Sequence, residues 1–399
     1  MLKKIIYVDN AATTSLSKNA LDAMLPFYKE HFGNPSSLYS IGFEAKKAME
    51  KARKDIAECI GAQHPQEIYF TSGGSESDNW AIKGVAKALL KKGKNHIITS
   101  NFEHHAVLHT VKSLEKEGFK VTYLDVYKNG IVNPKDLEKE ITEKTALVSI
   151  MYANNEIGTI QPIEELGNIC RKNKITFHTD AVQAVGHIPV NVVKDNVDLL
   201  SLSGHKFHGP KGVGALYIKK GTIIDNLIDG GAQEKSKRAG TENVAGIVGM
   251  TAALKESCEN LDQNYSKIIK LRDYLEYELL KIEDSILNGD VKNRLPGTIN
   301  ISFAGIEGES LLLLLNELGI CASSGSACTS HSLDPSHVLL AIGLKHEIAH
   351  GSLRITLNEE NTKEDIDTIA VTVPKIVKRL RDMSPLWEEM CKSKNKIRA

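Results

Sequence analysis

The sequence predicts an α/β fold with a largely parallel sheet, followed by a smaller α+β domain. Short β-branched runs alternate with helical patterns over roughly the first 260 residues, and such βα repetition is typical of a parallel sheet covered by helices on both faces. The alternation stops near residue 258, where a long amphipathic pattern begins. At 399 residues the chain exceeds one usual core, since domains hold roughly 100 to 200 residues. We therefore expect two domains.

The first region contains six strand-like runs. They are residues 67–72, 96–100, 121–126, 146–153, 175–180 and 197–203, each rich in β-branched or aromatic side chains. Between the runs, apolar residues recur at helical spacing, as from Ala45 to Ile60, and stop at a glycine such as Gly61. The second region opens with a helix-like segment at 264–282 and continues with a strand-like run at 298–303, a helix-like run at 310–318 and a strand-like run at 352–357. We expect residues 15–260 to form the large domain, and residues 1–14 with 261–399 to form the small one.

Composition excludes several classes of protein. Lys plus Arg number 50 and balance 50 Asp plus Glu, so nothing indicates a nucleic-acid partner or an anionic membrane surface. The longest mostly apolar stretch, 244–254, has 11 residues, whereas a membrane span needs about 20. No export signal is visible, and the six cysteines include no CxxC pair, which favours free thiols in a reducing compartment. These features predict a cytoplasmic protein.

Polar residues follow five of the predicted strands. Ligands bind at the carboxyl ends of strands in open α/β sheets, because loops and helix N-termini converge there. We therefore expect one site that collects these strand-end residues: Gly73, Gly74 and Ser75 after the first run, Glu103, His104 and His105 after the second, then Asn154 and Asn155, Asp180 and Gln183, and finally Ser203, His205 and Lys206.

The strand-end residues suit pyridoxal phosphate chemistry. The Gly73-Gly74-Ser75 turn opens a helix, whose free N–H groups can bind a phosphate. Lys206 could lose its proton when desolvated and attack a carbonyl group. Asp180 could pair with a protonated pyridine nitrogen, which draws off the electrons released at the substrate Cα. Neither a Walker loop nor a GxGxxG fingerprint is present.

Three further residues are candidates for chemistry. His104 could lie against the cofactor ring and move protons. Arg354, in the strand-like SLRITL, could bind a substrate α-carboxylate through its two-pronged guanidinium group. Cys328 lies in SSGSACTSHS, a composition typical of an exposed, mobile loop, where an accessible thiolate could act as a nucleophile. An alternative is a zinc site drawn from the Cys/His residues of the same region, although their spacing matches no tight structural motif: Cys321, Cys328, His331, His337, His346 and His350.

Taken together, these segments resemble a cysteine desulfurase of the NifS/IscS type. This type belongs to the class V aminotransferase group of fold-type I pyridoxal phosphate enzymes. The resemblance covers nearly the whole chain, and the lysine and cysteine segments are its most specific parts. The matching segments are YVDNAATT, NPSS, FTSGGSESDN, EHHAVL, NNEIGTIQPI, HTDAVQAVG, SLSGHKFHGPKGVGALY, RAGTEN, SSGSACTS and SLRITL.

The resemblance implies a fold and a set of roles. The fold would be a large domain with a mostly parallel seven-stranded sheet and a smaller α+β C-terminal domain that carries the cysteine loop. Lys206 would hold the cofactor covalently, Asp180 would pair with the pyridine nitrogen, and His104 would stack on the ring. Cys328 would accept sulfur from L-cysteine and carry it as a persulfide, with L-alanine as the other product. The remaining implied contacts are Gln183 and Asn155 to the cofactor or substrate, Arg354 and Asn155 to the substrate carboxylate, and Gly74, Ser75, Ser203, His205 and Thr241 to the phosphate.

The resemblance also implies partners. Thr241 would reach the phosphate of a second subunit, which makes the active enzyme a homodimer. The persulfide would pass to a sulfur acceptor such as an iron–sulfur cluster scaffold protein or a tRNA-thiolation relay. A selenocysteine lyase or another class V enzyme would share Lys206 and Asp180 without needing Cys328 for all its chemistry. Three places differ from the family pattern: Tyr39, residues 234–237, and Asn358 with Glu359.

Overall fold

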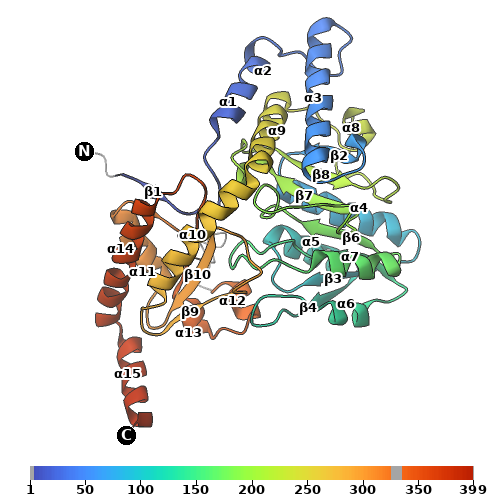
Figure 1. Cartoon of the computed structure of the whole chain (residues 1–399). Helices are drawn as coiled ribbons and strands as arrows, with labels where there is room; N and C mark the ends of the chain where they lie inside the picture. Colours follow the sequence, from blue (N-terminus) through green and yellow to red (C-terminus); the bar gives the residue numbers. More distant parts are fainter. Residues whose placement is uncertain (1–3, 325–334, 399) are drawn as a thin grey trace.

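The chain folds around two sheets that lie in different parts of the molecule. The structure, a computed structural model, describes residues 4–324 and 335–398. A seven-stranded sheet forms the centre of the larger part, and a three-stranded sheet with a separate two-stranded one forms the smaller part. Figure 1 shows the larger part in blue, green and yellow and most of the smaller part in gold, orange and red, with the blue N-terminal strand β1 (Ile6–Tyr7) beside it.

The seven-stranded sheet has the strand order β2-β8-β7-β6-β5-β3-β4. β8 is antiparallel to both of its neighbours, and the other neighbouring pairs in the sheet are parallel, so six strands point the same way. The predicted mostly parallel sheet is thus confirmed. The strands are β2 (Ile68–Thr71), β3 (His96–Ser100), β4 (Lys120–Leu124), β5 (Thr145–Ser149), β6 (Thr176–Asp180), β7 (Leu199–Ser203) and β8 (Gly214–Ile218).

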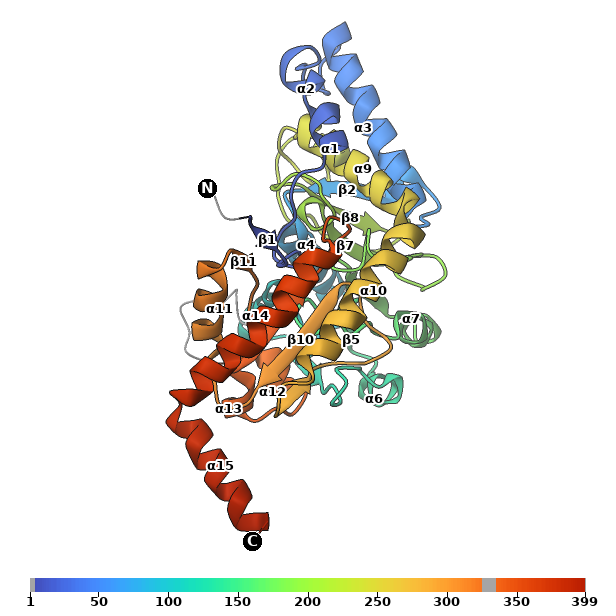
Figure 2. The same ribbon diagram turned by 60° about the vertical axis from the view of Figure 1, so that its left-hand side comes forward.

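Helices pack on this sheet because its strands are apolar on both faces. Every residue of β3, β5, β7 and β8 is buried, as expected for a sheet covered on both sides. The elements of this part are α1 (Lys18–Met24), α2 (Pro26–Lys29), α3 (Ser40–Cys59), η1 (Pro65–Glu67), α4 (Gly74–Leu90), α5 (His105–Lys116), α6 (Pro134–Glu140), α7 (Ile163–Lys172), η2 (Gly204–Lys206), α8 (Gln233–Ser236) and α9 (Val244–Glu259). In Figures 1 and 2, α1, α2 and α3 extend together beyond one end of the sheet, beside α9.

The smaller part is built on an antiparallel sheet in which β10 (Thr298–Phe303) lies between β9 (Ser285–Leu287) and β12 (Ser352–Thr356). β1 (Ile6–Tyr7), near the N-terminus, pairs in parallel with β11 (Ile320–Cys321). The helices are α10 (Leu261–Leu279), α11 (Gly308–Glu317), α12 (His337–Ala341), α13 (His346–Ala349), α14 (Lys363–Asp382) and α15 (Pro385–Arg398). Figure 2 shows α15 projecting from the end of α14.

Three hydrophobic clusters make up the core. Two contain residues of the seven-stranded sheet; one of these also includes Val338 and Leu339 of α12, and the other includes Trp80 of α4 and Val107 of α5. The third joins Ile6 and Val8 from the N-terminal segment to α10, β10, α11, β12 and α14, so the early residues pack with the late ones. The proposed division into 15–260 and 1–14 with 261–399 stays a prediction, which these clusters support.

All the predicted strands are present within a few residues of their expected bounds, but four others were not predicted. β1, β9 and β11 have only two or three residues, too few to show a period. β8 lies in the glycine-rich segment after Lys206, and glycine is uncommon in strands, so this segment does not show a strand pattern. In the described part of the chain, no helix is long and apolar enough to cross a bilayer.

Candidate active site

The carboxyl ends of β2, β3, β5, β6 and β7 meet at one cavity of about 340 Å³. Because these five strands point the same way, residues far apart in sequence become neighbours. The predicted residues that line the cavity are Gly74, Ser75, His104, Asn155, Asp180, Gln183, Ser203, His205, Lys206 and Arg354. Five lining residues were not predicted, namely Ala11, Ala12, Asp78, Met151 and Val182.

Lys206 enters the cavity from the short turn η2, which directly follows β7. Its Nζ donates hydrogen bonds to the backbone oxygens of Ala11, at 2.7 Å, and Ala12, at 2.8 Å. Gln183 Nε2 donates to the same oxygen of Ala11, at 3.0 Å. The N-terminal segment therefore forms one wall of the cavity and orients the amine.

Two buried carboxyl groups, those of Asp78 and Asp180, lie close together in the lining of the same cavity. Asp180 ends β6, and Asp78 lies in the second turn of α4; their side chains are almost fully enclosed. Burial raises the pKa of Asp180 to about 6, and the nearby Lys206 acts in the opposite direction. Burial and the neighbouring Asp180 raise the pKa of Asp78 well above its usual range. At neutral pH Asp180 is therefore the ionised member and Asp78 the protonated one.

Asp78, Asp180 and His104 each place one oxygen or nitrogen within 4.8 Å of the others. His178 lies next to Asp78: its Nε2 is 3.6 Å from Asp78 Oδ1 and 3.0 Å from Ser201 Oγ. Burial lowers the pKa of His178 to about 3, so this imidazole is neutral and supplies no cation to Asp78. Within residues 4–324 and 335–398 this is the only cluster of three possible metal ligands at such close range, so the described members of the proposed Cys/His zinc cluster do not converge.

The start of α4 forms an anion cradle at the edge of the cavity. Gly73, its N-cap, has a φ of 151°, which a larger residue rarely adopts. A Cβ on Gly74 would lie 2.6 Å from Val182 Cγ2, so only glycine lets the backbone approach there. Ser75, Ser203 and His205 border the same space. The free N–H groups and positive dipole end of a 17-residue helix suit a phosphate group.

His104 caps the helix that follows β3. Its Nδ1 accepts a hydrogen bond from the backbone N–H of Ala106, at 3.1 Å, which places the ring proton on Nε2. Burial, followed by the charge of Lys206, lowers the pKa of His104 to about 4. The ring therefore lines the cavity as a neutral imidazole in a fixed orientation.

Arg354 comes from the smaller part of the molecule and is buried in the middle of β12. Nη2 donates to Asp9 Oδ1 at 2.8 Å, and Nη1 donates to the backbone oxygen of Asn155 at 3.1 Å. Its Nε is buried without a hydrogen-bond partner. Asp9, which was not predicted, thus binds Nη2 of Arg354, whose side chain also lines the cavity.

Four of the strand-end residues expected in this site, Gly73, Glu103, His105 and Asn154, do not line the cavity, and two further predicted residues are not in this group. Thr241 is exposed and does not line the cavity of its own chain. Cys328 lies outside the described residues, as does His331. The structure therefore tests neither role.

The three places that differ from the family pattern have separate surroundings. Tyr39 is exposed at the start of α3. Glu234 is buried and forms a paired ion bridge with Arg53, although it and the two residues after it have positive φ. Glu359 lies 3.4 Å from His208 Nε2. None of these contacts the groups that line the cavity.

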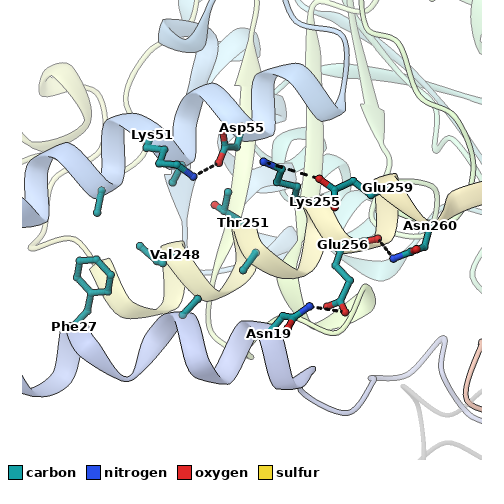
Figure 3. Close-up of a pocket in the computed structure, with 14 residues that line it drawn as sticks. Asn19, Phe27, Lys51, Asp55, Val248, Thr251, Lys255, Glu256, Glu259 and Asn260 are labelled. Atoms are coloured by element: carbon teal, nitrogen blue, oxygen red, sulfur yellow. Dashed lines mark hydrogen bonds and ion pairs between the residues drawn. The ribbon is translucent and has the colours of Figure 1, made fainter.

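A second, larger cavity of about 450 Å³ lies between α1, α3 and α9 and has no comparable chemistry (Figure 3). Its charged side chains pair with one another: Lys51 with Asp55 at 2.9 Å, and Lys255 with Glu259 at 4.0 Å. Asn19 Nδ2 donates to Glu256 Oε1 at 2.8 Å. A choice of site by cavity volume alone would therefore pick a cavity that contains none of the predicted site residues.

Comparison with known proteins agrees with this geometry. Residues 6–369 match the family described as Aminotransferase class-V. The chain is 58% identical to "Cysteine desulfurase IscS" of Methanosarcina thermophila over 383 residues, which cover 96% of this chain and 94% of that one. Among solved structures, a "NIFS-LIKE PROTEIN" is 43% identical with a TM-score of 0.89, covering 94% of this chain and all of that one. The structure "SspA in complex with cysteine" is 38% identical with a TM-score of 0.79, covering 88% of this chain and 98% of that one.

Proposed function

Since this chain belongs to the aminotransferase class-V family and matches relatives named cysteine desulfurases along nearly its whole length, we infer that it is a pyridoxal phosphate-dependent cysteine desulfurase. The observation that carries the inference is the cavity in which an amine, a buried carboxylate pair and a helix N-terminus face one another.

The cavity fits the cofactor. Its lining offers a place for each chemical part of pyridoxal phosphate: the N-terminus of α4 for the phosphate, Asp180 for the ring nitrogen, His104 for the ring face and Lys206 for the aldehyde carbon. When bound, pyridoxal phosphate withdraws electrons from the substrate Cα. The ionised Asp180 would keep the ring nitrogen protonated, which that electron withdrawal requires.

The substrate would be held and deprotonated by the chain's own residues. Arg354 would bind the carboxylate of L-cysteine through its guanidinium donors, with the side chain of Asn155 beside it. Asp9 and the backbone oxygen of Asn155 fix the guanidinium before the substrate arrives. Lys206 Nζ, once displaced by the substrate amine, would take the Cα proton, and His104 Nε2 would exchange a proton with the substrate.

Cys328 would complete the reaction. Its thiolate sulfur attacks the sulfur of the substrate, so that an S–S bond forms as the Cβ–S bond breaks. Two protons return to the carbon skeleton at Cβ and Cα, which gives L-alanine, and the enzyme keeps a persulfide on Cys328. No outside oxidant or reductant is needed, because one thiol and one cysteine give one persulfide and one alanine.

We also propose a homodimer in which Thr241 of each subunit reaches the phosphate of the other. Thr241 is exposed and does not line the cavity of its own chain, as this role requires. An exposed apolar surface on the segment from 16 to 43 is suited to a subunit interface. Its members are Leu16, Leu21, Leu25, Tyr28, Phe32, Leu38, Tyr39, Ile41 and Phe43.

The persulfide would then pass to an acceptor protein in the cytoplasm, such as an iron–sulfur cluster scaffold or a tRNA-thiolation relay. A selenocysteine lyase is the second candidate activity, and the SSGSACTS segment favours the desulfurase.

The test mixes purified holoenzyme with L-cysteine and measures alanine and protein-bound persulfide together. We expect equal amounts in the first turnover. A Cys328→Ala variant should keep the absorption of its bound cofactor but form no persulfide. Persulfide on that variant would refute the role of Cys328, and absence of alanine with the cofactor bound would refute the reaction itself. Selenocysteine as the preferred substrate would favour the second candidate.

A further inference from the structure

Three histidines gather beside the cofactor cavity without lining it. His105 and His109 are one turn apart on α5, and His337 is the first residue of α12. The ring centroid of His105 lies 4.9 Å from that of His109 and 4.8 Å from that of His337. The cluster therefore joins two elements that are more than 200 residues apart in the sequence.

We propose that His105, His109 and His337 form a binding site for a divalent transition-metal ion of the Zn²⁺ class. The proposal does not depend on the desulfurase reaction, and it concerns residues other than those that would bind the cofactor or substrate.

The ring separations are those of imidazoles that share an ion. A Zn–N bond is about 2.0 to 2.1 Å long, and the ring centroid lies about 1.1 Å beyond the nitrogen. Two ligand rings at 90 to 110° around one ion then have centroids about 4.5 to 5.2 Å apart. Both observed separations fall in this interval. In the structure as it stands, the three histidines do not each place a nitrogen within 4.8 Å of the others. Binding one ion would therefore require a rotation of at least His109, whose side chain is exposed.

The protonation of the rings also suits a metal. His337 Nε2 lies 3.0 Å from the backbone oxygen of Glu103, so Nε2 carries the proton and Nδ1 keeps a lone pair. This is the arrangement by which metal-binding histidines are usually oriented, with one ring N–H donated to a carbonyl or carboxylate. His105 Nδ1 is buried and has no hydrogen-bond partner, which leaves a costly unsatisfied atom.

A bound ion would have three nitrogen ligands and an open position for water, and it would tie the start of α12 to the helix that His104 caps.

The chain provides a matched control. His346 and His350 are also four residues apart, at α13, and their ring centroids lie 4.7 Å apart. Among the described residues, no third histidine ring contacts this pair. A double variant His346→Ala/His350→Ala removes one more imidazole than either test variant. It leaves the proposed site intact.

The experiment titrates holoenzyme with Co²⁺, whose visible absorption reports its coordination, in a phosphine reductant and without L-cysteine. We expect one Co²⁺ per subunit for the wild type and the control double variant, displaced by Zn²⁺. The variants His109→Ala and His337→Phe should each weaken binding tenfold or more. His109 is exposed, so its variant should fold normally. Equal binding by all four proteins, loss of binding in the control, or no binding by the wild type would each overturn the proposal.

Discussion

Replacing Asp78 by asparagine tests the protonation of the buried carboxyl pair directly. The two carboxylates approach within 4.8 Å, where two full negative charges would repel by about 3.5 kcal/mol at an effective dielectric constant near 20. That repulsion corresponds to a change of about 2.5 in the pKa of Asp180. Because we infer that Asp78 is already neutral, asparagine should change little, since it has the same shape and no charge.

The assay is the dissociation constant of pyridoxal phosphate from wild-type, Asp78→Asn and Asp78→Ala proteins between about pH 5 and 9. We expect the pH midpoint of cofactor binding by Asp78→Asn to stay within about 0.5 pH of the wild-type midpoint. A midpoint lower by about 2 or more would show that Asp78 is ionised and would refute the reasoning, because removing a negative charge makes Asp180 easier to ionise. Asp78→Ala leaves a void and removes the carboxyl group that hydrogen-bonds Ser201, although Ser201 keeps its contact with His178 Nε2, so its unfolding free energy should fall by about 1 to 3 kcal/mol.

Three other predictions concern ionic contacts. Arg354→Lys should raise the KM for L-cysteine by about tenfold or more, with a smaller effect on kcat, because lysine cannot make the two-pronged contact; an unchanged KM would contradict carboxylate binding. Arg53→Met should lower the unfolding free energy by about 3 to 5 kcal/mol in urea denaturation, since it leaves Glu234, 2% exposed, as an unpaired buried charge; a loss below about 1 kcal/mol would contradict this. For Glu359→Gln, the pH dependence of stability is the test. Burial opposes ionisation, but His208 lowers the pKa of Glu359 to about 2, and Glu359 in turn raises that of His208. The loss of stability caused by Glu359→Gln should be greatest between about pH 4.5 and 6.5, because both groups are charged there even in the unfolded chain. The loss should become smaller as pH falls towards 2 or rises past the pKa of folded His208. A loss of stability that does not depend on pH would contradict the pairing.

Much of the cavity could be predicted because its residues follow strands. Asp180 is the last residue of one strand-like run and Lys206 lies three residues after the end of another, and parallel strands bring such ends together whatever their separation in sequence. The shared direction of the parallel strands was therefore enough to predict that these two residues meet. The roles assigned to these residues remain predictions.

The residues that were missed have no such signal. Asp78 lies within a helical pattern, where an acidic residue normally faces solvent, and only the packing of α4 on the sheet turns it inward. Ala11 and Ala12 contribute backbone oxygens, which any residue would supply. The histidine cluster depends on α12 lying against α5, a tertiary contact that the sequence pattern does not encode.

The contact between Asp9 and Arg354 also concerns the order in which the chain is made. Asp9 and Asn10 contact β12, which is made about 345 residues after them. At 5 to 20 residues per second, this interval is about 20 to 70 s. Only after β8 (Gly214–Ile218) has been made does the N-terminal wall of the cavity lie beside a sheet that has all its strands. A nascent chain stalled before residue 354 should therefore contain the anion cradle and the hydrogen bonds from Gln183 and Lys206 to Ala11, but it should lack the contacts that join Asp9 and Asn10 to β12.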